Sequence, residues 1–257
     1  MFRAAYTNHT LCVYWSPITA ATMALLAALG RNFEQALLPN ACVFCGARRR
    51  HGERSICGPC CVDLPWIDSA CSRCAAPTVT QLPQGVLCAA CQQHPPPFEA
   101  AVAPLTYAFP VDAAIKAMKF RRKLSYGPVF ANILGASLTK LPAGIDAVLP
   151  VPLHWRRQAL RGFNQAEELA KPIGRFSGIP LIRNVYRVRA TPYQSGLAAE
   201  RRLGNLQGAF AVRGVLHARH VLVIDDVITT GETCSQIARS LLDAGAARVS
   251  ILAIARA

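Results

Sequence analysis

One thirteen-residue segment, residues 221–233, constrains the fold of this chain more than any other part of it. Its first four residues are all aliphatic and predict a strand that is buried on both faces. Two adjacent carboxylates, Asp225 and Asp226, follow directly, and a turn rich in threonine and glycine then leads into a helix near Thr233. A buried strand that runs into a turn and a helix is typical of a parallel sheet, where ligands bind at the carboxyl ends of the strands.

Strand and helix patterns alternate over the C-terminal part of the chain. The expected strands cover residues 100–109, 147–151, 181–188, 221–224 and 248–254. The expected helices cover residues 111–120, 128–141, 164–177 and 233–244. Pro172 is expected to kink or break the third helix. The alternation predicts an α/β fold in which a mostly parallel sheet carries helices on both faces.

The composition is that of a folded, basic protein. Of the 257 residues, 52% are hydrophobic, which supports a sizeable core and excludes disorder as the main state. The formal net charge is +14, and residues 151–220 hold twelve Lys or Arg against three acids. Such charge attracts polyanions, namely nucleotides, pyrophosphate or a nucleic-acid backbone. Charge alone does not choose among them, and a basic protein need not bind nucleic acid at all.

Eight of the eleven cysteines form four CxxC pairs near the N-terminus. The pairs are Cys42 with Cys45, Cys57 with Cys60, Cys71 with Cys74, and Cys88 with Cys91. Eleven residues separate the first two pairs and thirteen the last two, which is typical of zinc knuckles and not of disulfide-rich secreted domains. We therefore predict structural Zn²⁺ in one or two four-cysteine sites, which leave no coordination position open for catalysis.

The pairing of these knuckles has two alternatives. Neighbouring pairs would make two tandem ribbons, whereas alternate pairs would make a cross-braced module. Cys61 could replace Cys60, and Cys12 and Cys234 are expected to be ordinary thiols.

Three regions are expected along the chain. Residues 39–94 form the double zinc ribbon, and residues 95–257, which begin with three prolines, form the α/β domain. Residues 1–38 form an N-terminal extension and a lead-in helix, with Met23 as an alternative start. Residues 11–30 are largely apolar, but Pro17 interrupts them, so no membrane span is favoured and a cytoplasmic protein is expected.

The turn after the acidic pair has the chemistry of a phosphate site. Backbone N–H groups of residues 228–233, threonine hydroxyls and the helix N-terminus can all donate to an anion, and Gly231 lets the backbone approach it. Two carboxylates beside a phosphate would repel it unless sugar hydroxyls or a Mg²⁺ ion lay between. The local chemistry therefore fits a phosphate next to a diol, as in a ribose 5-phosphate.

This segment closely resembles the signature with which type I phosphoribosyltransferases bind phosphoribosyl pyrophosphate (PRPP). The resemblance implies that Asp225 and Asp226 hold the ribose hydroxyls, that residues 229–233 hold the 5-phosphate, and that Mg²⁺ binds with PRPP. The residues expected to bind PRPP are Asp225, Asp226, Val227, Ile228, Thr229, Thr230, Gly231, Glu232 and Thr233.

Residues 150–169 and 187–210 further resemble the ComF family, and the overall resemblance covers residues 24–257. That family joins a double zinc ribbon to a phosphoribosyltransferase-like domain and includes competence and GntX-like proteins. The resemblance implies that Arg161 joins the acidic pair as a catalytic residue through a bidentate contact to pyrophosphate, although Arg161 could instead belong to a solvated face. Lys119 could reach a phosphate or line a nucleic-acid path. Further expectations for the pyrophosphate side are Pro152, Leu153, His154, Gln194 and Arg201.

Two functions follow from the resemblance. The first is a phosphoribosyltransferase, a transferase of pentosyl groups, whose acceptor the sequence does not identify and which serves DNA uptake in natural competence or nucleotide-linked metabolism. The second is a non-catalytic module that binds single-stranded DNA and uses the PRPP turn as a ligand or phosphate sensor. Other DNA-uptake proteins would be partners in both. Aromatic residues are too sparse among the basic ones to predict a stacking platform for single strands.

Overall fold

The structure, a computed structural model, describes residues 41–49, 55–83, 85–188 and 208–257. Contacts between residues divide the chain into two units, Met1–Leu64 and Pro65–Ala257. The first two CxxC pairs lie in the smaller unit and the last two in the larger one. The expected lead-in helix lies outside the described residues, and the domain boundary expected after residue 94 stays a prediction.

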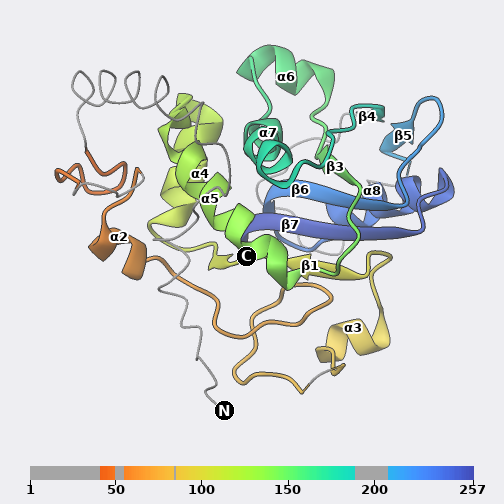
Figure 1. Ribbon diagram of the computed structural model, residues 1–257, viewed down its shortest axis with the longest axis horizontal. Coiled ribbons are helices and arrows are strands. Elements are labelled where there is room, and N and C mark those ends of the chain that lie inside the picture. Colours follow the sequence, from red (N-terminus) through yellow and green to blue (C-terminus); the bar gives the residue numbers. More distant parts are fainter. Residues whose placement is uncertain (1–40, 50–54, 84, 189–207) are drawn as a thin grey trace, which may run out of the picture. The chain divides into compact units, whose positions relative to one another are not determined.

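The larger unit is built on a parallel sheet of five strands (Figure 1). The strands are β1 (Ala100–Val102), β2 (Leu105–Thr106), β3 (Ala147–Pro150), β6 (His220–Ile228) and β7 (Arg248–Arg256). Their order is β1-β7-β6-β3, and β2 also pairs with β7. The long strands β6 and β7 lie at the centre, and each carries an almost unbroken run of buried residues.

Helices cover both faces of this sheet, as expected. The helices are α4 (Val111–Arg121), α5 (Gly127–Ser137), α6 (Trp155–Arg161), α7 (Gln165–Ser177) and α8 (Glu232–Asp243). Helices α5 and α7 pack on each other, α5 contacts β7, and α7 contacts β3 and β6. Helix α8 contacts β6 and β7, where Val221 and Val223 share a core cluster with Ile237 and Leu241. Because side chains alternate along a strand, Leu222 and Ile224 point to the opposite face.

Several local features differ from the expectations, among them the strand expected over residues 100–109, which is two short strands, β1 and β2. Strand β6 does not end at Ile224 but continues to Ile228, because β7 is long enough to extend the ladder, with Asp225 opposite Ala253. Helix α7 runs through Pro172 without a break, with buried residues on both sides of it, Leu169 and Ile173, while the alternative of a kink at Pro172 stays a prediction. Helix α6 was not expected.

A separate two-stranded antiparallel sheet follows α7. Its strands are β4 (Val185–Arg187) and β5 (Phe210–Val212), and Val185 lies opposite Val212. The expected strand over residues 181–188 is therefore regular over three residues only.

The segment that carries the last four CxxC cysteines packs directly on the α/β domain. The carbonyl oxygen of Ser72 accepts a hydrogen bond from the Ala101 N–H at 3.1 Å. Arg73 Nη2 donates to the carbonyl oxygen of Pro96 at 2.8 Å, and Ala75 belongs to the core cluster that contains Phe98. The second pair of knuckles and the sheet therefore share one hydrophobic core.

A close contact between α7 and the chain after it gives a test of this packing. We expect Gly174→Ala to lower the free energy of unfolding by roughly 1–3 kcal/mol. The reason is that a Cβ at residue 174 would lie 2.2 Å from Cδ1 of Leu181 and 3.0 Å from the carbonyl oxygen of Ile179. Urea denaturation measures the change.

Gly127→Ala in α5 is the matched control. Outside its own helix and its two chain neighbours, a Cβ there meets no atom within 4 Å, so the substitution should cost less stability than Gly174→Ala. No gain is expected, because the helical backbone of residue 127 precedes Pro128. Equal destabilisation by the two substitutions would contradict the packing described for α7.

Candidate functional site

The eight CxxC cysteines form two separate clusters. The first contains Cys42, Cys45, Cys57 and Cys60, and the second contains Cys71, Cys74, Cys88 and Cys91. Within each cluster all Sγ atoms lie within 4.8 Å of one another. This confirms the tandem pairing of neighbouring knuckles, with Cys60 and not Cys61 as the fourth member of the first cluster.

The geometry of both clusters fits a tetrahedral zinc ion. The Sγ atoms of Cys45 and Cys57 are 3.7 Å apart, and those of Cys74 and Cys88 are 3.6 Å apart. Zn–S bonds of about 2.3 Å would place the sulfur atoms about 3.8 Å apart. The N–H of Cys57 points at Cys42 Sγ and the N–H of Cys88 at Cys71 Sγ, each at 3.4 Å, as backbone donors do toward a thiolate. Both sites therefore have the ligands and spacing for structural Zn²⁺.

The protonation of the thiols agrees with a need for a cation. Burial would raise the pKa of Cys42, but backbone N–H donors outweigh it and lower that pKa to about 6. The same balance lowers the pKa of Cys71 to about 7. Burial, and then the neighbouring thiols, raise the pKa of Cys60 and of Cys91. Four thiols this close ionise together only around a positive ion, which Zn²⁺ supplies.

A second candidate site lies at the carboxyl end of β6. A cavity of about 350 Å³ opens there, and we call it the Asp225 cavity. It is lined by Tyr107, Lys119, Phe120, Val151, Leu153, Arg157, Arg161, Asn164, Gln165, Ala166, Arg187, Asp225, Asp226, Val227, Thr229 and Thr233. These residues come from the chain after β2, from α4, from the chain after β3, from α6, α7 and β4, and from the end of β6 through the start of α8, so the parallel topology brings distant segments to one edge of the sheet.

The acidic pair faces this cavity, and one of its members is held by an ion pair. Lys119 Nζ lies 2.8 Å from Asp226 Oδ2. Burial, and then the Asp226 charge, raise the pKa of Asp225 to about 7. Burial alone would lower the pKa of Lys119, but the attraction of Asp226 outweighs it and raises that pKa. The cavity thus contains a lysine that stays protonated, Lys119, and a carboxyl group with a pKa near neutral pH, that of Asp225.

Three arginines line the same cavity. Arg161 Nη1 donates to Gln165 Oε1 at 3.3 Å, and the Arg161 guanidinium lies 5.4 Å from the centre of the Phe120 ring. Burial, and then the charge of Arg157, lower the pKa of Arg187. Crowded cations of this kind are stabilised when an anion binds between them.

A buried amide adds an unused donor. Gln165 is 2% exposed, and its Nε2 has no hydrogen-bond acceptor among the described residues. A buried donor without an acceptor is costly, and a ligand oxygen in the cavity would satisfy it.

A side chain at the end of β7 holds the backbone of the turn after β6. Arg256 Nη1 donates to the carbonyl oxygens of Ile228, at 3.1 Å, and of Thr229. Gly231 has a φ of +79° and caps α8. Within the described part of the chain, no hydrogen bond uses the N–H groups of Thr229, Thr230 or Gly231. These donors, the hydroxyls beside them and the positive end of α8 are the kinds of groups that can bind an anion.

The predicted PRPP residues fall into two groups. Those that line the Asp225 cavity are Asp225, Asp226, Val227, Thr229 and Thr233. Ile228 is buried at the end of β6, and Thr230, Gly231 and Glu232 form the turn and the first residue of α8. The Glu232 carboxylate accepts a hydrogen bond from Gln236 Nε2 at 2.6 Å, so it braces the helix start.

The residues predicted for the pyrophosphate side are dispersed. Arg161 and Leu153 line the Asp225 cavity, whereas Pro152 lines a neighbouring one. His154 is 6% exposed and its Nδ1 accepts a hydrogen bond from the Arg156 N–H at 3.3 Å, which caps α6. Gln194 and Arg201 lie outside the described residues.

Several lining residues were missed by the sequence reasoning. Tyr107, Arg157, Arg187 and Gln165 were not singled out for this cavity, and Lys119 had an alternative role. The signal for Arg157 and Arg187 was their place in basic stretches, which contain too many arginines to choose between. Only the fold shows which of them turn toward the acidic pair.

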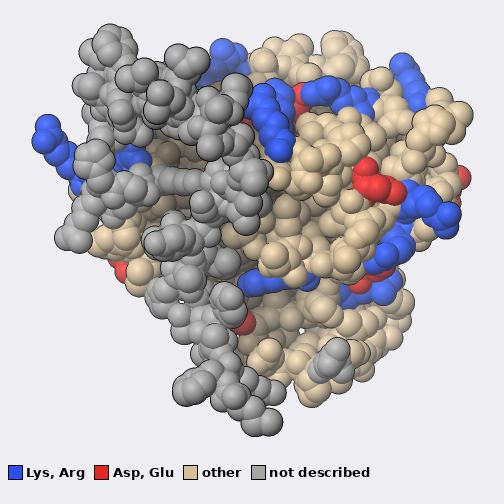
Figure 2. All heavy atoms as spheres, viewed as in Figure 1, with Lys and Arg blue, Asp and Glu red and all other residues tan. Residues whose placement is uncertain are grey.

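The basic residues do not form one continuous surface on the face shown in Figure 2. Lys and Arg side chains of the described residues gather there in separate groups with uncharged surface between them. Among the described residues, no helix has both the length and the apolarity to cross a bilayer.

Comparisons with known proteins find matches to the zinc-ribbon segment and to most of the chain. Residues 33–92 match the model of a double zinc ribbon domain. The DNA utilization protein YhgH of Escherichia coli K12 is 33% identical over 226 residues, which cover 85% of this chain and 98% of that protein. Competence protein F of Haemophilus influenzae is 32% identical over 182 residues, which cover 66% of this chain and 78% of that protein.

A solved structure with detectable similarity is the glutamine PRPP amidotransferase from B. subtilis in complex with ADP and GMP. It is 22% identical, with a TM-score of 0.34, and the match covers 50% of this chain and 26% of that chain.

The two cysteine clusters should differ in what they stabilise. Cys88→Ser and Cys45→Ser should each release one zinc ion per chain, as measured with a colorimetric chelator. Only Cys88→Ser should lower the main thermal unfolding temperature, because its cluster shares the core of the larger unit. Equal shifts of that temperature in both variants would contradict this assignment.

The acidic pair should lower the free energy of unfolding of the ligand-free protein. Because the pKa of Asp225 is raised in the fold from 3.8 to about 7, stability is lost as pH rises through this range. Asp225→Asn should therefore raise the melting temperature, by an amount that grows from about pH 4 to about pH 7 and then levels off. Scanning calorimetry at several pH values measures it.

Asp226→Asn is the contrasting variant for the same experiment. It removes the partner of Lys119 and also the charge that helps to raise the pKa of Asp225, so its gain should be smaller than that of Asp225→Asn. A lower melting temperature for Asp225→Asn at pH 8 would show that the charge on Asp225 is not destabilising.

Proposed function

This chain belongs to the ComF family, and from that premise we propose that its Asp225 cavity binds PRPP together with Mg²⁺ and transfers the phosphoribosyl group to an acceptor. The observation that carries the proposal is one juxtaposition. Two carboxylates, at the carboxyl end of a central parallel strand, lie beside a turn whose N–H groups are unused in the described structure. That arrangement matches a sugar diol joined to a phosphate.

The cavity offers a distinct group for each part of PRPP. The N–H groups of residues 229–231 and the hydroxyls of Thr229 and Thr233 would hold the 5-phosphate. Asp225 and Asp226 would accept hydrogen bonds from the ribose hydroxyls. Arg157, Arg161 and Arg187 would contact the pyrophosphate, for which the unused Gln165 amide is a further donor.

The charges of the cavity fit Mg²⁺ as a companion of PRPP. Mg²⁺ is a hard cation that prefers oxygen ligands, and when it is bound to the pyrophosphate it supplies electrostatic stabilisation of the leaving group. The protein's own lysine already lies 2.8 Å from Asp226, so Lys119 must move or share that carboxylate when the ribose hydroxyls arrive.

The reaction itself breaks the bond between C1 of the ribose and the pyrophosphate oxygen. Positive charge develops at C1, and the lining arginines stabilise the negative charge that the pyrophosphate gains. An acceptor nitrogen or oxygen then forms a bond to C1 and releases its proton to solvent. Pyrophosphate leaves with the electron pair of the broken bond.

We further propose that this chemistry serves the uptake or use of DNA. The printed names of the relatives, a DNA utilization protein and a competence protein, support such a role. A non-catalytic version of it, in which PRPP is a sensed ligand and single-stranded DNA is the bound partner, is the second candidate and rests on the same names and on the basic residues.

Binding is the first prediction. Mg–PRPP should bind more tightly as pH rises to about 7, because Asp225 must lose its proton to accept hydrogen bonds from the diol. Titration calorimetry near pH 6.5, in buffers of different ionisation enthalpy, should show proton release. The double variant Asp225→Asn, Asp226→Asn should bind at least about tenfold more weakly and release no proton.

Asp243→Asn is the matched control, since it changes an exposed carboxyl at the last residue of α8. Unchanged PRPP affinity in the double variant would contradict the proposed site. Once binding is established, release of pyrophosphate in the presence of bases, amines or nucleotides separates the two candidates. Binding without release for every acceptor class would favour the sensor over the transferase.

A further inference from the structure

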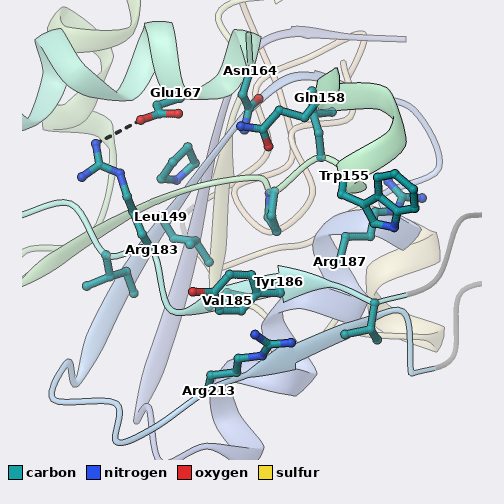
Figure 3. Close-up of a pocket in the computed structure, with 15 residues that line it drawn as sticks. Leu149, Trp155, Gln158, Asn164, Glu167, Arg183, Val185, Tyr186, Arg187 and Arg213 are labelled. Carbon is teal, nitrogen blue, oxygen red and sulfur yellow. Dashed lines mark hydrogen bonds and ion pairs between the residues drawn. The ribbon is translucent and has the colours of Figure 1, made fainter. Parts of the chain in front are cut away.

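A larger cavity lies beside the Asp225 cavity. Its volume is about 610 Å³, within the range of small-molecule sites, and we call it the Tyr186 cavity (Figure 3). Its walls come from the chain after β3, from α6 and α7, and from the β4–β5 sheet. Leu153, Asn164 and Arg187 line both cavities, so the two share a wall.

Aromatic side chains stand at the surface of the Tyr186 cavity. Trp155 is 66% exposed and Tyr186 is 43% exposed, so both rings offer apolar surface to a ligand. The Arg156 guanidinium lies 5.2 Å from the centre of the Trp155 ring. In Figure 3 the Tyr186 ring lies between Arg213 on one side and the Asn164 and Gln158 side chains on the other. One face of the ring is therefore covered by a guanidinium, and the other face looks into the cavity.

Positive charge surrounds these rings. Three arginines, Arg183, Arg187 and Arg213, line the cavity with one carboxylate, Glu167, which is already paired with Arg183 at 3.0 Å. The Arg213 guanidinium lies 4.6 Å from the centre of the Tyr186 ring. A cation stacked on an aromatic face is a common partner for a base and its phosphate.

The remaining wall is apolar, with one adaptable polar group. Leu149, Ile182 and Val185 contribute aliphatic surface, which suits a flat ring. The exposed Gln158 amide can donate and accept in one plane, as the edge of a nucleobase does.

We propose that the Tyr186 cavity binds a nucleotide, with its base against Tyr186 and Trp155 and its phosphate on Arg213 and Arg187. An apolar ligand would leave the arginines unused, and a simple anion would leave the exposed rings unused. A base joined to a phosphate uses both. Two sources can supply this nucleotide, a free nucleoside monophosphate or one unit of a single-stranded DNA, and the site does not require PRPP in the neighbouring cavity.

The test compares binding of four probes to the full chain by titration calorimetry. The probes are deoxyadenosine 5′-monophosphate (dAMP), deoxyadenosine, inorganic phosphate and a single-stranded decamer of deoxyadenosine. dAMP should bind more tightly than deoxyadenosine or phosphate alone. Tyr186→Ala and Arg213→Gln should each weaken binding of dAMP or of the decamer by about tenfold, as expected for one base stack or one charged hydrogen bond.

Matched variants separate this site from its surroundings. Tyr186→Phe keeps the ring and should keep the affinity, and Arg175→Gln, an exposed arginine of α7 that does not line the cavity, should leave binding unchanged. Thermal unfolding of each variant shows whether it is folded. If Tyr186→Ala and Arg213→Gln lose binding of dAMP, the occupant is a free nucleotide. If these two variants lose binding of the decamer alone, the occupant is a nucleotide within a DNA chain.

The result is independent of the proposed PRPP site. The double variant Asp225→Asn, Asp226→Asn should retain nucleotide binding, while Tyr186→Ala should retain PRPP binding. Equal affinity of the folded Tyr186→Ala and Arg213→Gln variants and of wild type for every probe would overturn the proposal. So would dAMP binding that is lost only when the acidic pair is changed.

Discussion

Two carboxylates at the end of a buried strand are the constraint on which the rest of the α/β domain depends. Asp225 and Asp226 lie on β6, where it pairs with β7, so the paired backbone fixes the positions of both residues at the carboxyl end of the sheet. In the ligand-free protein Lys119 compensates one of them at 2.8 Å, and the other keeps its proton up to about pH 7. A charge arrangement of this kind is unfavourable for folding and useful for binding, because a ligand that brings hydroxyl groups relieves it.

The surrounding elements place cations and donors around this pair. Arg256, the last residue of β7, donates hydrogen bonds to the carbonyl oxygens of Ile228 and Thr229 and so holds the backbone of the turn after β6. Arg157, Arg161 and Arg187 reach the cavity from α6 and β4. The second cysteine cluster packs on the same sheet through Ala75, so a metal that holds the ribbon also supports the strands that carry the site. Arg187 lines both cavities.

Much of this could be predicted from the sequence, and the reasons are local. The run of aliphatic residues before Asp225 has one favourable structure, and the spacing of the CxxC pairs is typical of zinc knuckles. That spacing left tandem and cross-braced pairing open, and only the fold shows that neighbouring knuckles pair. Other features depend on tertiary contacts. The extension of β6 to Ile228 requires the neighbouring β7, and the continuity of α7 through Pro172 requires buried contacts on both sides. The pairing of Lys119 with Asp226 joins residues more than a hundred positions apart, and the basic stretches offer no way to select Arg157 and Arg187 from their neighbours. Nothing in the sequence singles out Trp155 and Tyr186 as binding residues, because only the fold shows that both are exposed at one cavity.

The central claim concerns where a sugar phosphate would lie. The most direct test is a crystal structure of the full chain with Mg²⁺ and PRPP. Our account predicts the ribose hydroxyls within hydrogen-bond distance of Asp225 and Asp226, and the 5-phosphate on the N–H groups of residues 229–231. A ligand that binds elsewhere, or one whose ribose lies away from a still intact pair of Lys119 and Asp226, would contradict it.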